Sequence, residues 1–199
     1  MYIYDAVRSP RGRGKKDGKL HSVRPVELVR QLILALLERN PTLPPAAIED
    51  VILGCVTQIK EQGSNVAKVA AQAAGLPDTV AGVTLNRFCA AGLEAVNQGA
   101  AYLRAGVGEA FLCGGVESMS RVPMGSDGGA WYTDPLVAFE GYYVPQGVAA
   151  DLIATLYGYS REKLDAFAVR SHQRAAHATR EGYFQKSLIP VRGPLGEIL

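Results

Sequence analysis

One stretch decides the fold, Val83-Thr-Leu-Asn-Arg-Phe-Cys89-Ala-Ala-Gly-Leu-Glu-Ala-Val-Asn-Gln-Gly-Ala-Ala-Tyr-Leu-Arg-Ala-Gly106. Its front end, at 81–85, is a short apolar and partly β-branched run, which predicts a buried strand. Residues 90–105 are rich in alanine and carry apolar side chains at helical spacing, with Gly106 as a typical helix terminator. Cys89 therefore lies where a strand gives way to a helix.

This junction suggests a chemical role for the Cys89 thiol. The unpaired N–H groups and the positive dipole end of a helix N-terminus favour an anion, and hence a thiolate. A thiolate attacks carbonyl carbon atoms, and nearby N–H groups can hold the oxyanion that forms. The alternative is that Cys89 is a small core hydrophobe, which is the commoner role of a lone cysteine. Cys55 and Cys113 fit that alternative, because both lie inside apolar, strand-like runs.

Composition restricts the class of protein. The chain has 199 residues, of which 48% are hydrophobic and 22 are glycine, indicating one α/β core or one domain with a sizeable appendage. A formal net charge of +2 is too small to indicate a nucleic-acid partner. Three cysteines without the spacing of a disulfide framework favour a reducing compartment. No run approaches the ~20 apolar residues of a membrane-spanning helix, and the first residues are already strand-like, so we expect a cytoplasmic protein without a signal peptide.

Apolar strands alternate with helical segments in the first part of the chain. This alternation predicts a sheet covered by helices on both faces. We expect the helix at 90–105 to be buried between layers, with Leu93 and Val96 on its inner stripe, rather than to lie on the surface. The strands are expected at 2–7, 51–56, 81–85 and 109–115, and the other helices at 25–39, 65–74, 147–157 and 161–181.

Two groups of polar residues have competing interpretations. The basic loop at 8–18 either grips a phosphate or is simply solvated. His172 and His177 are five residues apart on a predicted helix and so cannot share one face as ligands, while His21 stands alone. We therefore expect no metal site. The segment 117–146 is rich in turn formers and aromatic residues, which is typical of a functional or assembly loop.

The segment Asn86-Arg-Phe-Cys89-Ala-Ala-Gly-Leu-Glu-Ala-Val96 closely resembles the nucleophile segment of the thiolase family, the acetyl-CoA acetyltransferases and 3-ketoacyl-CoA thiolases. Two further blocks agree in order and spacing. They are Cys113-Gly-Gly-Val-Glu-Ser-Met-Ser-Arg-Val-Pro123 and, resembling a helix of the family's loop domain, Leu164-Asp-Ala-Phe-Ala-Val-Arg-Ser-His-Gln-Arg-Ala175. The opening Tyr4-Asp-Ala-Val-Arg-Ser-Pro-Arg-Gly-Arg13 also resembles a thiolase start.

The resemblance implies a fold, an activity and partners. The fold would be a thiolase-like layered α/β fold, with a mixed sheet and the nucleophile in a domain at 1–117 and an incomplete, mostly helical loop domain at 118–199. Cys89 would take the acyl group as a thioester, and its backbone N–H would contribute to an oxyanion hole. Coenzyme A and acyl-CoA would be substrates, with no bound cofactor, and the protein would form a homodimer or homotetramer.

The chain also departs from the family pattern. Many thiolases carry His-Met-Gly where this chain has Pro145-Gln146-Gly147, so Gln146 either lines the acyl or pantetheine end of the substrate site or is a turn residue without a ligand role. The family's C-terminal catalytic segments, Gly-His-Pro, Cys-x-Gly and Asn-Glu-Ala, do not occur in these residues. We therefore expect the chain alone not to sustain turnover. The alternatives are a ketoacyl-synthase-like condensing enzyme and a non-catalytic subunit for acyl-CoA binding or assembly.

Overall fold

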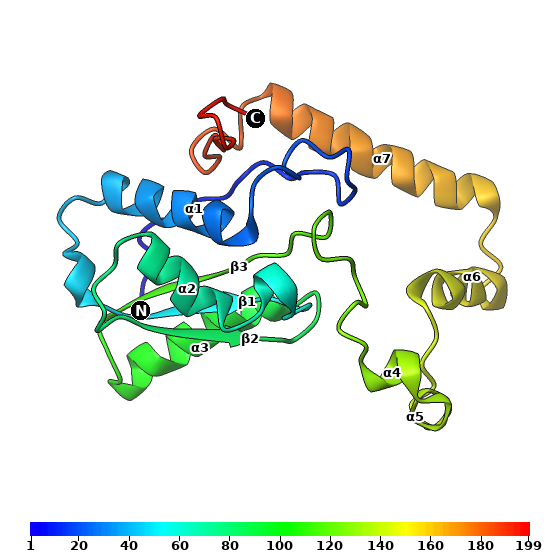
Figure 1. Ribbon diagram of the computed structural model, residues 1–199. Coiled ribbons are helices and arrows are strands. Elements are labelled where there is room, and N and C mark those ends of the chain that lie inside the picture. Colours follow the sequence, from blue (N-terminus) through cyan, green and yellow to red (C-terminus); the bar gives the residue numbers. More distant parts are fainter. The chain divides into compact units, whose positions relative to one another are not determined.

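The computed structural model describes residues 1–199, which form two compact units. The first unit comprises Met1–Asp127 together with Ser187–Leu199, and the second comprises Gly128–Lys186. The first unit contains the β-sheet, whereas the second is built from helices and their connections (Figure 1). Cys89 belongs to the unit that contains the sheet.

A three-stranded parallel sheet with the order β2-β1-β3 forms the centre of the first unit. Its middle strand is buried on both faces, as its apolar run predicts, and Val51 and Ile52 are wholly inaccessible to solvent. The strands predicted at 81–85 and 109–115 are confirmed, and the one predicted at 51–56 begins earlier, at Ile48. The strands are β1 (Ile48–Gly54), β2 (Ala81–Leu85) and β3 (Ala110–Gly115).

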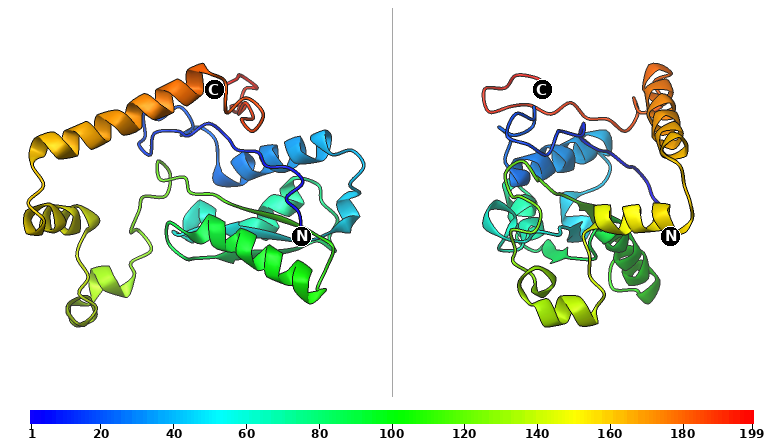
Figure 2. Two further views of the ribbon diagram at one scale, coloured as in Figure 1. Left: turned by 180° about the vertical axis from the view of Figure 1, so that it is seen from behind. Right: turned by 90° about the vertical axis from the view of Figure 1, so that its right-hand side faces the viewer.

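Helices cover both faces of this sheet, which confirms the predicted α/β layering. Helices α1 (Pro25–Arg39) and α2 (Val66–Ala73) cover one face, and α3 (Ala91–Ala105) covers the other (Figures 1 and 2). The short 3-10 helices η1 (Pro45–Ala47) and η2 (Lys60–Gln62) lie in the connections. The core on the α1–α2 side consists of Val29, Ile33, Ile48, Val51, Leu53, Ala67, Ala70, Ala71, Leu76 and Val80.

Helix α3 approaches the sheet through its smallest residues. Ala91, Ala95 and Gly99 are its buried positions, whereas Leu93 is 65% exposed. The prediction that α3 is buried between two layers is therefore wrong: one face packs on the sheet, and the face with Leu93 is exposed. Sterics decide which face meets the sheet: a Cβ atom at Gly99 would lie 2.5 Å from Sγ of Cys113, so only a face without large side chains can come this close to β3.

The first predicted strand, at 2–7, is not formed. Tyr2, Ile3 and Tyr4 are 80%, 74% and 90% exposed, and the nearest backbone pairing is an isolated bridge between Arg8 and Leu188. Apolar alternation specifies the two faces of a strand but not the partner that its N–H and C=O groups require. Without a fourth strand the sheet is parallel throughout, not mixed as expected.

The second unit contains four helices, two of them short. The helices predicted at 147–157 and 161–181 are confirmed, and the predicted Ser160 cap is present, with its Oγ accepting a hydrogen bond from the Lys163 N–H (3.4 Å). The expected aromatic loop contains two helical turns, beside which the rings of Trp131 and Tyr143 stack at 5.2 Å. No helix of the chain is both long and apolar enough to cross a membrane. The helices are α4 (Ala130–Thr133), α5 (Pro135–Glu140), α6 (Gln146–Leu156) and α7 (Arg161–Arg180).

The division between the units lies after Asp127, not after residue 117 as expected. Residues 118–127 stay with the first unit because Ser118 and Val122 are buried there and the Arg121 guanidinium forms an ion pair with Glu61. That pairing lowers the pKa of the Glu61 carboxyl through the hydrogen bonds from Arg121.

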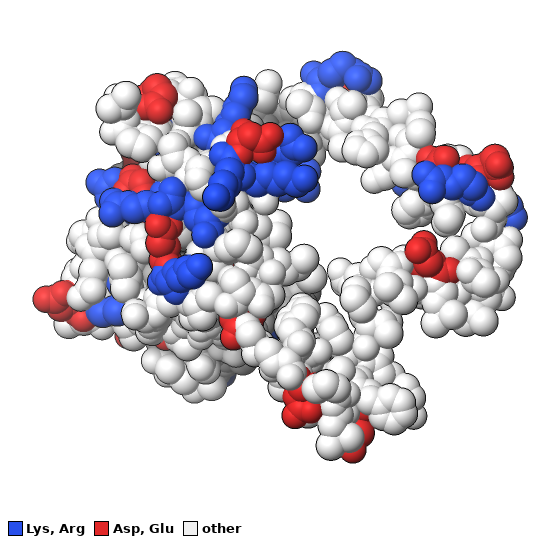
Figure 3. Space-filling model, turned by 45° about the vertical axis from the view of Figure 1, so that its right-hand side comes forward, with Lys and Arg blue, Asp and Glu red and all other residues white.

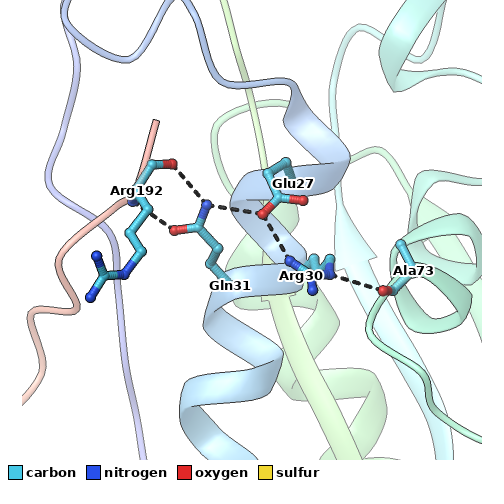
Figure 4. A network of polar contacts seen from close by, with 5 residues as sticks. All are labelled: Glu27, Arg30, Gln31, Ala73 and Arg192. Carbon is cyan, nitrogen blue, oxygen red and sulfur yellow. Dashed lines mark hydrogen bonds and ion pairs between the residues drawn. The ribbon is translucent and has the colours of Figure 1, made fainter. Parts of the chain in front are cut away.

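The last residues also return to the first unit, where α1 holds them. The Gln31 carboxamide donates to the Arg192 carbonyl (3.0 Å) and accepts from the Arg192 N–H (2.8 Å), as a neighbouring strand would (Figure 4). Glu27 accepts hydrogen bonds from both Gln31 and Arg30 (3.0 Å each), which fixes the carboxamide in this orientation. The second unit therefore ends at Lys186, and residues 187–199 belong to the first.

We predict that Gly99→Ala destabilises the chain, although alanine favours helices. The new methyl group collides with the Cys113 sulfur, and overpacking of this kind costs about 1–3 kcal/mol against a gain of about 1 kcal/mol in helix propensity. Adding Cys113→Ala to the Gly99→Ala chain should recover the lost stability, because it removes the colliding sulfur atom. Urea unfolding followed by circular dichroism measures both effects. Gly92→Ala is the matched control in α3, since its methyl group would meet nothing closer than the Gly114 oxygen at 3.9 Å. Equal effects at positions 92 and 99 would contradict the argument.

Candidate active site

The candidate site lies at the carboxyl ends of the three parallel strands. These ends share one edge of the sheet, where ligand sites of α/β proteins are usually found. The Cys55 N–H donates to the Leu85 carbonyl (2.9 Å) and the Val116 N–H donates to the Gly54 carbonyl (3.0 Å), so the strands remain paired to their last residues. Cys55 follows β1, Asn86 follows β2, and Glu117 lies two residues beyond β3.

Cys89 is placed as the sequence predicts, between the end of β2 and the start of α3. It is the exposed member of the three cysteines, all of which are free thiols. The N-cap of α3 is Ala90, and no side chain caps the N–H groups of the first turn. Most helices use Ser, Thr, Asp or Asn at this position, and alanine forgoes about 1 kcal/mol. The Ala91 N–H donates to the Phe88 carbonyl, and Glu94 of this turn pairs with Arg87, so it is the dipole of α3, without a capping side chain, that favours an anion near Cys89.

Gly54 sets the position of the start of α3 against the sheet. A Cβ atom at this last residue of β1 would lie 2.3 Å from the carbonyl carbon of Ala91. Only a residue without a side chain at this strand end allows the first turn of α3 to lie directly against the sheet edge. Cys89 lies two residues before α3 begins, so the same packing places the turn that carries it.

The turn before Cys89 has an unusual backbone. Phe88 has φ +49°, in the left-handed region, which costs about 1–2 kcal/mol for a residue with a side chain. Its N–H donates to Oδ1 of Asn86 (2.8 Å). The Arg87 carbonyl then accepts from the Ala90 N–H (3.1 Å), and the Phe88 carbonyl accepts from the Ala91 N–H (2.9 Å). Cys89 thus lies inside a tight, hydrogen-bonded turn, not in a flexible loop.

Sequence reasoning missed Glu117 as a structural member of this edge. Its carboxylate accepts hydrogen bonds from the Val56 N–H (2.7 Å), from the Thr57 N–H (3.4 Å) and from Nε2 of Gln62 (2.8 Å). Gln62 is wholly buried, and its Oε1 accepts from the Ser118 N–H (2.5 Å). The available signal was a charged residue directly after the apolar β3 run, where buried backbone groups that leave a sheet need partners.

Of the other two cysteines, Cys55 occupies the core position predicted for it, whereas Cys113 lies in β3 as expected but is only half-buried. Cys55 is 1% exposed, and burial together with the nearby Glu117 carboxylate raises the pKa of its thiol to about 12. Cys113 lies under α3, and burial together with Asp50 raises the pKa of its thiol to about 11. Both groups are therefore protonated, and unreactive as nucleophiles, at neutral pH.

The other residues considered from the sequence, Gln146 and the histidines of α7, belong to the second unit, whereas Cys89 belongs to the first. Gln146 is the first residue of α6, exposed and in the second unit, so its role in substrate binding stays a prediction. His177 pairs with Glu181 on α7 (3.8 Å), and no group of three His, Cys, Asp or Glu side chains is placed to hold a metal ion.

The contacts of the basic loop at 8–18 favour the interpretation that it is solvated and does not grip a phosphate. Arg13 pairs with Asp17 (2.9 Å), with both side chains 65% exposed. Figure 3 shows Lys and Arg interspersed with Asp and Glu on the face drawn, not a surface of one sign. A hollow near the start of α1 contains Arg24, Glu27 and Arg192 but no residue of the strand ends.

We predict that iodoacetamide alkylates Cys89 much faster than Cys55 or Cys113 in the folded chain. At pH 8 the raised pKa values leave about 1 in 10,000 of the Cys55 thiols and about 1 in 1,000 of the Cys113 thiols as thiolate. As the pH rises towards 10, labelling of Cys113 should accelerate before that of Cys55. Peptide mapping by mass spectrometry measures each site, and Cys89→Ser should lose the fast reaction. Equal labelling of the three cysteines in a chain with native circular dichroism would contradict the assignment.

Comparison with known proteins identifies the family. Residues 1–197 match the model of the thiolase N-terminal domain. The 3-ketoacyl-CoA thiolase of Shewanella sp. (strain MR-7) is 45% identical over 193 residues, which are 96% of this chain and 49% of that protein. The 3-ketoacyl-CoA thiolase of Shewanella denitrificans is 44% identical over the same shares. The crystal structure of the Bacillus anthracis acetyl-CoA acetyltransferase superposes with a TM-score of 0.79 at 34% identity, covering 95% of this chain and 50% of that one. The chain thus spans about half the length of these proteins, and it belongs to the thiolase family.

Proposed function

We propose that this chain supplies the nucleophile of an acyl-CoA C-acyltransferase of the thiolase type. The observation that carries the proposal is the exposed Cys89 thiol at the uncapped start of α3. The two other thiols of the chain are suppressed by burial, so a single sulfur is available for attack. The names of the similar proteins, 3-ketoacyl-CoA thiolase and acetyl-CoA acetyltransferase, support the same chemistry.

The reaction proceeds in two acyl transfers. In the degradative direction the Cys89 thiolate attacks the 3-keto carbonyl carbon of a 3-ketoacyl-CoA, and the bond between C2 and C3 breaks. The electron pair of that bond takes up a proton, acetyl-CoA leaves, and the shortened acyl group stays on Cys89 as a thioester. The thiolate of a second coenzyme A then attacks this thioester and releases Cys89. Run in reverse, the same steps condense an acyl-CoA with acetyl-CoA, which is a second acetyl-CoA when the acyl group is acetyl.

Residues of this chain contribute to the first transfer in two ways. Cys89 forms the covalent bond, and its own backbone N–H contributes to the oxyanion hole that stabilises the negative oxygen of the tetrahedral intermediate. The proton transfers to and from the sulfur and the acetyl carbon need an acid and a base. The thiolase segments Gly-His-Pro and Cys-x-Gly are absent from these 199 residues. We therefore expect the chain alone to accept an acyl group but not to turn over.

The proposal extends to ligands and surroundings. Coenzyme A and acyl-CoA act as substrates, with no resident cofactor, and the reaction belongs to fatty acid metabolism. The three free thiols favour a reducing compartment such as the cytoplasm. Large apolar side chains stand exposed in the second unit, among them Phe139 (80%) and Leu156 (71%), which supports assembly as a homodimer or homotetramer.

Acetyl transfer to Cys89 tests the proposed function. Purified chain incubated with acetyl-CoA should gain one acetyl group, located on Cys89 by peptide mapping. Cys89→Ser should reduce the rate of transfer by a factor on the order of 1,000 or more, because a hydroxyl is a far weaker nucleophile at neutral pH. Cys113→Ser is the matched control and should retain the transfer. Acetylation at another residue, or none at all, would count against the proposed role of Cys89 and favour a non-catalytic subunit. Steady thiolysis by this chain alone would disprove the expected lack of turnover.

Gln146 is open to a separate test of acyl preference. We propose that it contacts the acyl or pantetheine end of the substrate, where many thiolases carry methionine. Gln146→Met exchanges a carboxamide for an apolar side chain of similar length, so acyl transfer from longer, more apolar thioesters should increase relative to acetyl transfer, by up to about tenfold. Competition between acetyl-CoA and octanoyl-CoA for Cys89 measures this ratio. Gln185→Met, outside α6, is the control. An unchanged ratio would mean that Gln146 has no ligand role.

A further inference from the structure

The Asn86 side chain continues the sheet where the backbone of β2 leaves it. The last backbone rung runs from the Cys55 N–H to the Leu85 carbonyl (2.9 Å). At the next position the Asn86 carboxamide takes over: its Nδ2 donates to the Val56 carbonyl (3.2 Å), and its Oδ1 accepts from the Phe88 N–H (2.8 Å). One side chain therefore connects the segment after β1 with the turn that carries Cys89.

The Val56 end of this connection is itself fixed. The Val56 N–H donates to Oε2 of Glu117 (2.7 Å), so the residue is held through both of its backbone polar groups. Gln62, wholly buried, donates to Oε1 of Glu117 (2.8 Å) and to the Thr57 carbonyl (2.9 Å). Asn86 is thus anchored to a residue that is itself hydrogen-bonded to the end of the sheet through Glu117.

The Phe88 end determines the direction of the chain at Cys89. Phe88 has a positive φ of 49°, which a residue with a side chain rarely adopts without support. Its N–H is held by Asn86, and its carbonyl accepts the Ala91 N–H at the start of α3 (2.9 Å). A second side-chain contact at this turn, the ion pair of Arg87 with Glu94 (3.2 Å), has Arg87 64% exposed and so adds little.

We propose that Asn86 is a positioning residue for the nucleophile. Its two hydrogen bonds tie the turn at Phe88 to the end of β1 and so hold the Cys89 thiol at the uncapped start of α3. The catalytic meaning of this placement rests on the proposed function, in which Cys89 takes the acyl group. An ordinary local turn needs only the bond from the Phe88 N–H to Oδ1. The second bond, from Nδ2 to Val56, is the one that links the turn to the sheet.

The test uses the 199-residue chain and three variants. Asn86→Ala removes both hydrogen bonds. Asn86→Ser keeps an acceptor for the Phe88 N–H, because a hydroxyl can form the same local turn, but it is too short to reach Val56. Asn97→Ala, at an exposed position of α3, is the matched control. Three rates are measured for each: amide hydrogen exchange of the segment 86–92, alkylation of each cysteine by iodoacetamide, and acetyl transfer from acetyl-CoA to Cys89.

For Asn86→Ala we expect exchange in 86–92 to accelerate about tenfold and both reactions at Cys89 to slow about tenfold, the size expected for losing about one net hydrogen bond. Cys55 and Cys113 should stay unreactive, which shows that the core is intact. Asn86→Ser should recover part of the rate at Cys89, and Asn97→Ala should match the parent chain. Unchanged or faster reaction at Cys89 would overturn the proposal. So would increased labelling of Cys55 in both Asn86 variants, because Asn86 would then only stabilise the fold.

The proposed function and the positioning role fail in different ways. If the parent chain takes no acetyl group from acetyl-CoA, the proposed function fails. Exchange and alkylation still decide in that case whether Asn86 positions Cys89. If the parent chain is acetylated and Asn86→Ala is acetylated equally fast, the function stands and the positioning role is refuted.

Discussion

The close approach of α3 to the end of β1 is the constraint on which the site depends. The backbone at Ala91 lies where a side chain at Gly54 would be, with 2.3 Å between the Ala91 carbonyl carbon and the position of that Cβ. Further along the helix, Gly99 permits the same closeness to Cys113. Because the contact is made at two points, the axis of α3 is fixed relative to the sheet. Cys89, two residues before the helix begins, is therefore located by the packing of Ala91 and Gly99 against the sheet.

At the sheet edge, polar side chains add hydrogen bonds to the packing that positions the site. Backbone N–H and C=O groups lose their partners where parallel strands end, and buried ones must find others. Glu117 accepts the N–H groups of Val56 and Thr57, and Asn86 serves the Val56 carbonyl. These replacements give the backbone groups of Val56 and Thr57 partners where the chain leaves β1. The apolar core fixes the layers, and this polar edge fixes the geometry of the turn at Phe88 and Cys89.

The sequence predicted local secondary structure better than it predicted which distant segments contact one another. The strand at 81–85, the helix that starts after Cys89 and its terminator Gly106, with φ +70°, follow from periodicity and from the αL preference of glycine. The first strand, the inner face of α3 and the role of Glu117 depend on contacts between distant segments. Leu93 looked like a core residue because it is large and regularly spaced, yet the sheet admits only the face of Ala91, Ala95 and Gly99. Steric limits of that kind come from the neighbour and are not encoded in the helix's own pattern.

The same edge also explains why one thiol out of three is suited to attack. Cys55 is the next residue after β1 and shares the strand ends with the site, so it could compete with Cys89 for an acyl group. Burial and the Glu117 carboxylate raise the pKa of Cys55 to about 12 and keep it protonated. Glu117 therefore acts in two ways: its hydrogen bonds hold Val56, to which Asn86 is anchored, and its charge disfavours a second thiolate nearby. An uncharged acceptor at position 117 could hold the backbone but would weaken this discrimination between the two cysteines.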